Sequence, residues 1–435
     1  MIPASGKTHP AQQAKATTPS GAVVERPSVF DIFLDPKIMA DPYPLYERVL
    51  AEYPVQGEGG LPLVLTRYAD VSAALAHPLL STDDRHDVVQ KSMAASGEMA
   101  PHLVAMMDRR SFLHRDPPEH TRLRGLAGRV LTPGRLARAT EAGRRACDQL
   151  LDDAAGQDSM ELIADFAYPL PAAVLGPLLG IPVDTGREVP WWRSQMSADF
   201  EAPAVAGVDC ASYASTVQDQ MIARFDELIA AKRDHPGDDV VTDLLAAADA
   251  GKLSAADVND TCRLLVVAAH ETMTGLIANG MLALLRNPGQ LALVREDRAR
   301  AAGAVEEVLR YDAPIQFVRR VAVRDVEVNG IPVNGERMVF GWIGAANRDP
   351  ARFTEPGRFD ISRDDHGHLG FGGGAHACLG ASLARPLAGM ALAALCGRLI
   401  EPELTADPPP YLPNAVRAIE SLPVSFRAIG SRRPI

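Results

Sequence analysis

Apolar residues recur every three or four positions along most of this chain, and that spacing constrains its fold more than any other feature. Such spacing places the apolar side chains on one face of an α-helix. Five segments have it clearly: 41–53, 67–78, 119–131, 134–154 and 215–235. A further segment, 264–285, is apolar on nearly every face and is interrupted by His270 and Glu271. We therefore expect a helix-rich protein with one helix buried in its interior.

One region departs from the helical spacing. Residues 321–340, VAVRDVEVNGIPVNGERMVF, alternate apolar and polar residues as strands do, and contain the tight-turn dipeptides Asn329-Gly330 and Asn334-Gly335. No repeat and no long proline-rich linker divides the chain. The prediction is a mainly α protein with small β-sheets (α+β), forming one unit over 28–435. Residues 1–27 are polar and proline-spotted without an apolar signal-peptide core, so we expect a flexible N-terminal tail.

Charge and cysteine usage narrow the class of partner. The chain has 435 residues and a formal net charge of -11, which argues against binding to nucleic acid or anionic lipid. The sequence contains no run of about 18 uncharged apolar residues, so we expect no membrane span. Its five cysteines are odd in number, widely spaced and free of CxxC pairs, which disfavours disulfides and zinc ribbons. We expect a cytoplasmic protein that acts on a small molecule.

A glycine-rich loop, GFGGGAHACLG at 370–380, places Cys378 just before a helical pattern. Glycine permits backbone angles that side chains forbid and lets the chain approach a flat ligand closely. A thiolate at a helix N-terminus is stabilised by the helix dipole. One isolated sulfur suits axial ligation of haem iron better than zinc or iron–sulfur sites, which need several ligands. On these residues alone, a buried cysteine in a glycine-rich bend explains the loop equally well.

Four stretches, taken together and in order, resemble the bacterial, soluble class of the cytochrome P450 family. FGGGAHACLG is similar to the family's cysteine loop, and AAHET at 268–272 resembles the acid–alcohol motif of its central helix. EEVLR is similar to the family's Glu-x-x-Arg, and DPPEHTRLR at 116–124 resembles the start of a haem-contacting helix. The resemblance spans roughly 41–425. It implies a single-domain cytochrome P450 fold, with 28–435 as the haem domain and haem b (iron protoporphyrin IX) as the cofactor.

The resemblance also implies roles for individual residues. It makes Cys378 the iron ligand and assigns proton delivery during dioxygen activation to Thr272 and Glu271. The other cofactor-binding residues, several of them partners of the haem propionates, are His120, Arg124, Arg320, His376, Phe371, Gly372 and Ala268. A structural network beneath the cysteine loop is assigned to Glu307, Arg310 and Arg358.

The residue types fit these roles, although other interpretations stay open. A buried carboxylate such as Glu271 costs several kcal/mol unless it is paired or protonated, which favours a function, but this side chain could instead reach solvent. The Thr272 hydroxyl can donate a hydrogen bond to a carbonyl one turn back. This bond could open the helix, or it could serve only as a hydrogen-bond partner for the hydroxyl. Glu307 and Arg310 share a helix face, which by spacing alone also fits an exposed ion pair. The basic residues could form a solvated surface.

The function implied by the resemblance is that of a haem-thiolate monooxygenase. Such an enzyme inserts one oxygen atom from O2 into an apolar, medium-sized organic substrate by hydroxylation or epoxidation, here in natural-product biosynthesis. Electrons would come from a ferredoxin and a ferredoxin reductase, with docking near Arg122, Arg129 and Arg385. The expected substrate pocket is lined by 80–112, 192–212, 267–268, 315–318 and 418–419.

Two other functions remain as alternatives: a haem-binding sensor or carrier without oxygen activation, and a peroxide-driven peroxygenase. A zinc protease is excluded because the HExxH motif would need a histidine where Thr274 stands. Two residues depart from the family pattern. Ala269 replaces a more usual glycine beside the oxygen site, and Pro386 should kink or delay the helix after Cys378, because proline inside a helix costs about 3 kcal/mol.

Overall fold

The computed structural model describes residues 16–17, 23–24, 27–33, 35–57, 61–83, 86, 111–181, 208–407, 409–411 and 416–432, with side chains from residue 219 onward in the helix that begins at 208. The predicted N-terminal tail, 1–27, therefore falls mostly outside the described residues. Within it, β1 (Ala16–Thr17) pairs with β2 (Val23–Val24) in antiparallel fashion.

Helices make up most of the described chain, which confirms the predicted fold class. The five amphipathic segments form α2 (Tyr43–Glu52), α3 (Tyr68–Ala76), α6 (Glu119–Val130), α7 (Pro133–Asp153) and α10 (Val208–Asp234). The other helices of eight or more residues are α8 (Pro169–Leu179), α11 (Val240–Asp249), α12 (Ala255–Arg286), α13 (Pro288–Glu296), α14 (Ala301–Tyr311) and α16 (Ala381–Arg398). Shorter turns are η1 (Val29–Phe33), α1 (Pro36–Ala40), η3 (Phe112–His114), η4 (Ile163–Ala167), η5 (Arg298–Arg300), α15 (Ile343–Ala346) and η6 (Gly374–His376).

The central helix α12 contains the expected buried segment and extends it at both ends. It begins in a capping box, in which the Ser254 hydroxyl accepts from the Asp257 N–H and the Asp257 carboxylate accepts from the Ser254 N–H. These two bonds satisfy N–H groups that a helix start leaves without partners. Most residues from Met273 to Leu284 are buried, as expected for a helix surrounded by protein.

Five strands form the main sheet, in the order β3 (Val55–Gln56), β4 (Leu63–Leu65), β10 (Met338–Gly341), β7 (Val318–Ala322) and β5 (Leu80–Ser81). β4 and β10 run parallel, and the other neighbours run antiparallel. Small pairings outside this sheet involve β6 (Ser159–Glu161), β11 (Leu399–Ile400), β12 (Glu403–Leu404), β13 (Pro423–Ser425) and β14 (Ala428–Ile429).

The two predicted tight turns have different outcomes. Asn329 and Gly330 both have positive φ, at 49° and 82°, and connect β8 (Val326–Val328) to β9 (Ile331–Val333) in a hairpin. Asn334-Gly335 instead links β9 to β10, which pair with different strands. There Glu336 takes the positive φ of 64°.

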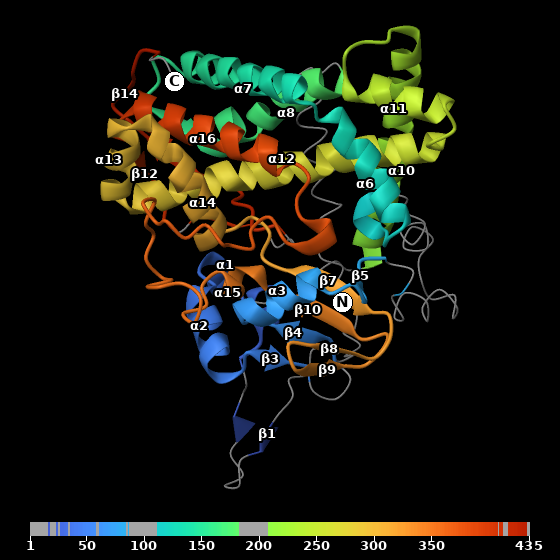
Figure 1. Ribbon diagram of the computed structural model, residues 1–435. Coiled ribbons are helices and arrows are strands. Elements are labelled where there is room, and N and C mark those ends of the chain that lie inside the picture. The colour runs from blue at the N-terminus through green and yellow to red at the C-terminus, as the bar shows by residue number, and fades with distance from the viewer. Residues whose placement is uncertain are drawn as a thin grey trace, which may run out of the picture.

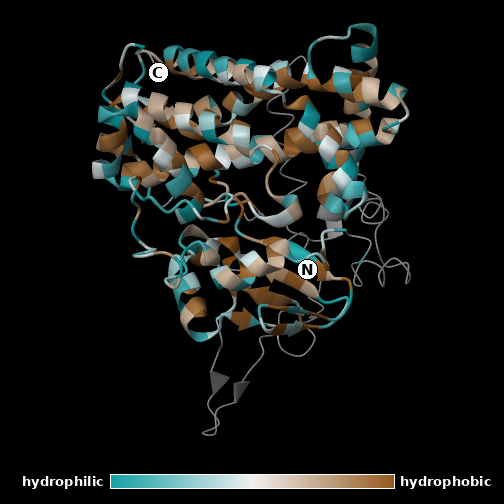
Figure 2. Ribbon diagram, in the orientation of Figure 1, coloured by the Kyte–Doolittle hydropathy of each residue, from teal (hydrophilic) through white to brown (hydrophobic). Residues whose placement is uncertain are grey.

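Helices and sheet occupy separate parts of the molecule. In Figure 1, α7, α8, α12 and α16 form a helical part, while the main sheet lies in the other part with α2 and α3 beside it. Figure 2 shows hydrophobic residues gathering on the strands of that sheet. η6 packs against α3, so the loop that ends in Cys378 lies where the two parts meet. Among the described residues, no helix is long and apolar enough to cross a lipid bilayer.

Candidate functional site

The loop before α16 is held tightly against both parts of the molecule. Gly372 and Gly374 have φ of 68° and 64°, a region that side chains rarely adopt. A Cβ on Gly374 would lie 2.3 Å from the Leu75 carbonyl oxygen of α3, and one on Gly370 would lie 2.7 Å from the Leu309 carbonyl oxygen of α14. The predicted need for glycine in this loop therefore has a direct steric cause.

Cys378 stands at the end of this loop, with its N–H donating to the Phe371 carbonyl at 2.9 Å. Its side chain is exposed, whereas Cys147, Cys262 and Cys396 are buried. Desolvation by the surrounding protein raises the pKa of the Cys378 thiol. The backbone N–H groups of Gly380 and Ala381 oppose that shift by stabilising the thiolate. Binding of a metal ion would displace the thiol proton, because metal ions bind the thiolate form.

Four basic residues that the sequence singled out come together beside the loop. The His120 and His376 rings lie 4.1 Å apart, and the Arg124 guanidinium donates to the Ala377 carbonyl at 2.6 Å. Burial lowers the pKa of His376 to about 3, with further contributions from His120, Arg320 and Arg124. Burial also lowers the pKa of Arg320 to about 10, and Asp116 partly offsets this effect. The positive charges of Arg124 and Arg320 therefore lie near His376, with Asp116 close to Arg320.

The nitrogens of His120 give a direct test of whether a haem fits here. His120 is 3% exposed, and neither ring nitrogen has a hydrogen-bond partner among the described residues. Buried polar atoms normally have partners, so these nitrogens can accept a polar group that the described residues do not supply. A carboxylate would also supply the negative charge that Arg124 and Arg320 need. A soft sulfur donor, a glycine-lined loop and a cationic cluster together fit a haem with its propionates.

The acid–alcohol pair lies on α12. Glu271 is buried, and Thr272 donates its hydroxyl to the Ala268 carbonyl at 2.6 Å, one turn earlier. Ala268 itself is exposed, although α12 runs through the protein. This bond is the helix-internal arrangement that the sequence allowed for Thr272, and it leaves one face of the helix accessible at Ala268.

The predicted network beneath the loop forms, with one correction. Glu307 and Arg310 are 3% and 1% exposed and make a two-point contact at 2.7 and 2.8 Å. The prediction that the Arg358 side chain is their partner was wrong. This side chain is 59% exposed and pairs with Glu355 and Asp360. Arg358 contributes only its carbonyl, which accepts from Arg310 at 3.0 Å.

The side chain that Arg358 was expected to supply comes from Arg363. Its Nε lies 3.4 Å from Oε2 of Glu307, and its own side chain is 15% exposed. The two arginines are five positions apart in a segment without regular structure. Helical or strand spacing therefore offered no signal that could distinguish them.

Other sequence predictions have mixed outcomes. Pro386 does not delay the helix: α16 starts at Ala381, five residues before it, and continues past it to Arg398. Most of the expected substrate-pocket lining, including 87–110 and 192–207, lies outside the described residues. Sequence reasoning missed Thr82, whose hydroxyl oxygen lies 3.2 Å from Nε2 of His376.

Comparison with known proteins points to one family. The family description "Cytochrome P450" matches residues 209–399. The chain is 34% identical to the biotin biosynthesis cytochrome P450 of Bacillus subtilis, over 90% of this chain and 97% of that protein. It is 35% identical to the cytochrome P450 monooxygenase PikC of Streptomyces venezuelae, over 92% and 95% of the two chains.

Solved structures agree with these relatives. The chain resembles the structure of P450BioI in complex with an acyl carrier protein ligated to hexadec-9Z-enoic acid, with a TM-score of 0.80 and 32% identity. The match covers 90% of this chain and 99% of that one.

Proposed function

This chain belongs to the cytochrome P450 family and is a haem-dependent monooxygenase, and from that premise we propose how its own residues serve the reaction. Cys378 supplies the thiolate ligand to the haem iron. His120, Arg124, Arg320 and His376 bind the propionates, and Phe371, Gly372 and Ala268 contact the macrocycle. The observation that carries this proposal is the pair of unpartnered, buried His120 nitrogens beside Arg124.

Haem that is bound through a thiolate promotes cleavage of the O–O bond of O2. The chain controls protons and water around that chemistry. In this proposal Glu271, which is buried in α12, holds a proton, and Thr272 passes it onward once its hydroxyl turns away from the Ala268 carbonyl. Glu307, Arg310 and Arg363 keep the loop in position from beneath. Residues 28–435 would work as one haem domain.

We propose an apolar, medium-sized organic substrate that is hydroxylated or epoxidised as a biosynthetic intermediate. Two similarities support this class: a relative named for biotin biosynthesis, and a structure that contains a long-chain fatty acid on a carrier protein. Of the residues that the sequence places in the pocket, Ala418 and Ile419 are apolar and buried, whereas Gln316 is polar and Ala268 is exposed.

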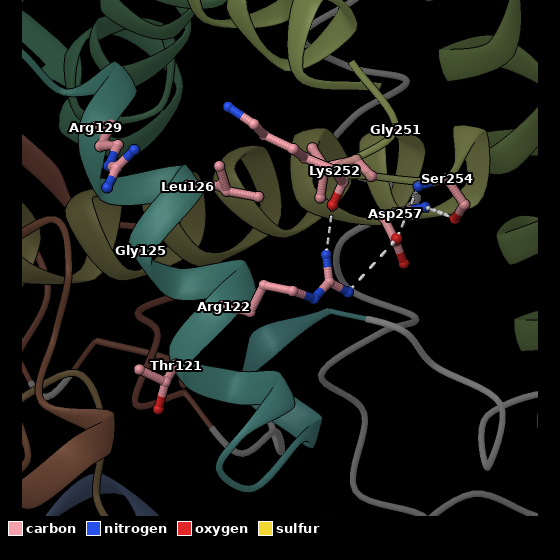
Figure 3. A pocket seen from close by; sticks show the side chains of 10 residues that line it. Thr121, Arg122, Gly125, Leu126, Arg129, Gly251, Lys252, Ser254 and Asp257 are labelled. Carbon is pink, nitrogen blue, oxygen red and sulfur yellow. Dashed lines mark hydrogen bonds and ion pairs between the residues drawn. The ribbon is translucent and has the colours of Figure 1, made fainter. Parts of the chain in front are cut away.

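A ferredoxin is the electron donor that best fits the surface near the cysteine loop. Arg122, Arg129 and Lys252 line an open groove of about 730 Å³ between α6 and the start of α12 (Figure 3). The Arg122 guanidinium donates to the Lys252 carbonyl at 2.6 Å and points towards Asp257. Arg129 lies on the same groove and is exposed. An acidic partner such as a ferredoxin, itself reduced by a ferredoxin reductase, would find complementary charge here. Such partners, and the free cysteines of the chain, suit the cytoplasm.

The test begins with Cys378→Ala. In the wild type, the reduced, carbon monoxide-bound protein should give the long-wavelength Soret band of thiolate ligation. The variant should lose that band, because no other described cysteine is exposed. An unchanged band in the variant would exclude Cys378 as the ligand.

Activity assays on the wild-type protein distinguish the three candidate activities. A monooxygenase should consume NADH in the presence of a surrogate ferredoxin, its reductase and a substrate that shifts the haem spin state. A peroxygenase would turn over the same substrate with peroxide alone. A sensor or carrier would give no product under either condition.

A further inference from the structure

A chain of contacts joins α14 and α16 to the loop that carries Cys378, and the proposed function does not use it. Glu306 on α14 accepts from Arg385 on α16, with Nε to Oε1 at 2.7 Å and Nη2 to Oε2 at 3.2 Å. The same Oε2 lies 3.1 Å from Nε2 of His368. The Glu306 side chain is 13% exposed and that of Arg385 is 46% exposed. One carboxylate thus holds two side chains together.

Both of these side chains contact the loop. The Arg385 guanidinium carbon lies 4.6 Å from the centre of the Phe371 ring, a cation–π contact. On the other side, Nδ1 of His368 accepts the Gly370 N–H at 3.1 Å. The Phe371 carbonyl in turn accepts the Cys378 N–H. Glu306 therefore supports the loop at two neighbouring residues, one of which bonds the cysteine directly.

The network also carries charge. Burial opposes ionisation of Glu306, but hydrogen bonds from His368 and Arg385 outweigh it and lower its pKa to about 2. Glu306 is therefore an anion at neutral pH, paired with the cationic Arg385.

We propose that Glu306 and Arg385 are positioning residues that fix Phe371 and the Cys378 loop, and that their charges shift the reduction potential of the haem bound there in opposite directions and largely cancel. The proposal rests on the role of Cys378 proposed above. Charge and hydrogen bonding around a ligating sulfur tune the potential of the metal. Reduction adds an electron to the site, so Arg385 favours the reduced form and Glu306 favours the oxidised form.

The test compares Glu306→Gln, Arg385→Gln and the double variant as holoproteins, in a potentiometric titration with dithionite and redox mediators. Glu306→Gln leaves the charge of Arg385 uncompensated and should raise the equilibrium constant for one-electron reduction by about threefold or more. Arg385→Gln leaves the negative charge of Glu306 uncompensated and should lower that equilibrium constant by a similar factor. The double variant should lie near the wild type.

Opposite signs are the decisive result, because a loosened loop alone would shift both single variants in the same direction. Arg385→Lys keeps the positive charge and should stay closer to the wild type than Arg385→Gln does. Glu141→Gln is the matched control: it neutralises an exposed glutamate that bridges Arg144 and Arg145 on α7, and it should leave the potential unchanged. Should Glu306→Gln fail to fold, the two Arg385 variants still decide the sign.

Shifts of the same sign in both single variants, or no shift in either, would overturn the proposal. This failure is distinguishable from failure of the proposed ligand. If Cys378→Ala keeps the wild-type spectrum, the ligand assignment is wrong. If the wild type gives the thiolate spectrum but the charge variants keep its potential, only the present inference fails.

Discussion

Glu307 is a buried carboxylate with several partners beneath the cysteine loop. Its side chain is 2% exposed, and it accepts from Arg310 through both oxygens and from the Asp360 N–H at 2.9 Å. Arg363 adds a further positive charge at 3.4 Å. A buried carboxylate needs this many partners, since each lost partner leaves desolvated charge behind.

Arg363→Ala should therefore destabilise the protein far more than Arg358→Ala. We expect Arg363→Ala to lower the free energy of unfolding by about 1–3 kcal/mol, because Glu307 loses a charge partner in a buried setting. Arg358→Ala removes an exposed ion pair and should stay within about 0.5 kcal/mol. Chemical denaturation of both variants measures the difference. Equal losses would contradict the placement of Arg363, rather than Arg358, against Glu307.

His270 makes the protein sensitive to acid. It is fully buried in α12, with the Tyr168 ring 4.2 Å away, and burial lowers its pKa from 6.5 to about 3. As the pH falls below 6.5, this histidine becomes protonated in the unfolded chain but stays neutral in the folded chain, so the free energy of unfolding falls. Between pH 7 and 5 this single histidine should account for about 2 kcal/mol of lost stability.

His270→Leu should remove that acid sensitivity. We expect the free energy of unfolding to change less between pH 7 and 5 in this variant than in the wild type, whatever the offset at pH 7. His235→Leu, an exposed histidine at the end of α10, is the control and should keep the wild-type slope. An unchanged slope in His270→Leu would show that other groups dominate the acid response.

At this scale, sequence could predict residues whose chemistry is unusual for their setting. Cys378 in a glycine loop and His120 near Arg124 stood out and do come together with the loop. Arg363 and the Glu306–Arg385 pair did not stand out, because arginine and glutamate are common on helices and in loops. Which of them meet is decided by how α14, α16 and the loop pack, and no spacing rule carries that information.

Among the elements, α16 shows how a helix tolerates an unfavourable residue. Pro386 is its sixth residue and cannot donate to the carbonyl of Ser382, yet the helix continues for twelve residues beyond it. Both Pro386 and Ser382 are exposed, so water can bond the carbonyl that proline leaves without a donor. The buried residues that follow, from Leu387 to Cys396, hold the helix against its neighbours.

Pro386→Ala should stabilise α16, because it restores the missing hydrogen bond. We expect a rise of about 1–3 kcal/mol in the free energy of unfolding, towards the lower end because the Ser382 carbonyl is already solvated. Thermal unfolding followed by circular dichroism measures the gain. Ser382→Ala, on the same face with the proline kept, should change little. A lower midpoint in Pro386→Ala would mean that the proline ring contributes packing that outweighs the bond.

Elements with strong periodicity were predictable, and short ones were not. Burial of one face decides whether a helix such as α7 forms, and that pattern is visible over its 21 residues. β6, β12 and β13 have only two or three residues each, too few for alternation to appear. β6 and β13 pair with each other although they lie more than 200 residues apart in the chain.

Over the whole molecule, a net charge of -11 coexists with a locally basic groove. The overall negative charge would repel an acidic donor at long range, so docking must depend on the short-range field of Arg122, Arg129 and Lys252. Such interactions weaken as salt screens them over about 10 Å at 0.1 M ionic strength.

Charge reversal in the groove should therefore impair electron transfer selectively. We expect Arg129→Glu to raise the KM for a ferredoxin by about tenfold at low salt, with a smaller effect at high salt. Carbon monoxide binding by the chemically reduced protein should not change. Arg145→Glu, an exposed arginine on α7, is the matched control. An equal effect from both variants would point to net charge rather than to the groove.

The close fit of Gly374 against the Leu75 carbonyl makes the sulfur-bearing turn a shared property of two distant stretches of chain. Whether a chimera of this protein and a relative folds correctly would therefore depend on the contact between Gly374 and Leu75. A chimera that exchanges residues 68–76 together with 370–380 keeps the two surfaces matched. A crossover that parts them would combine surfaces that never evolved together, and the loss of fit would fall on the loop that carries the proposed ligand Cys378.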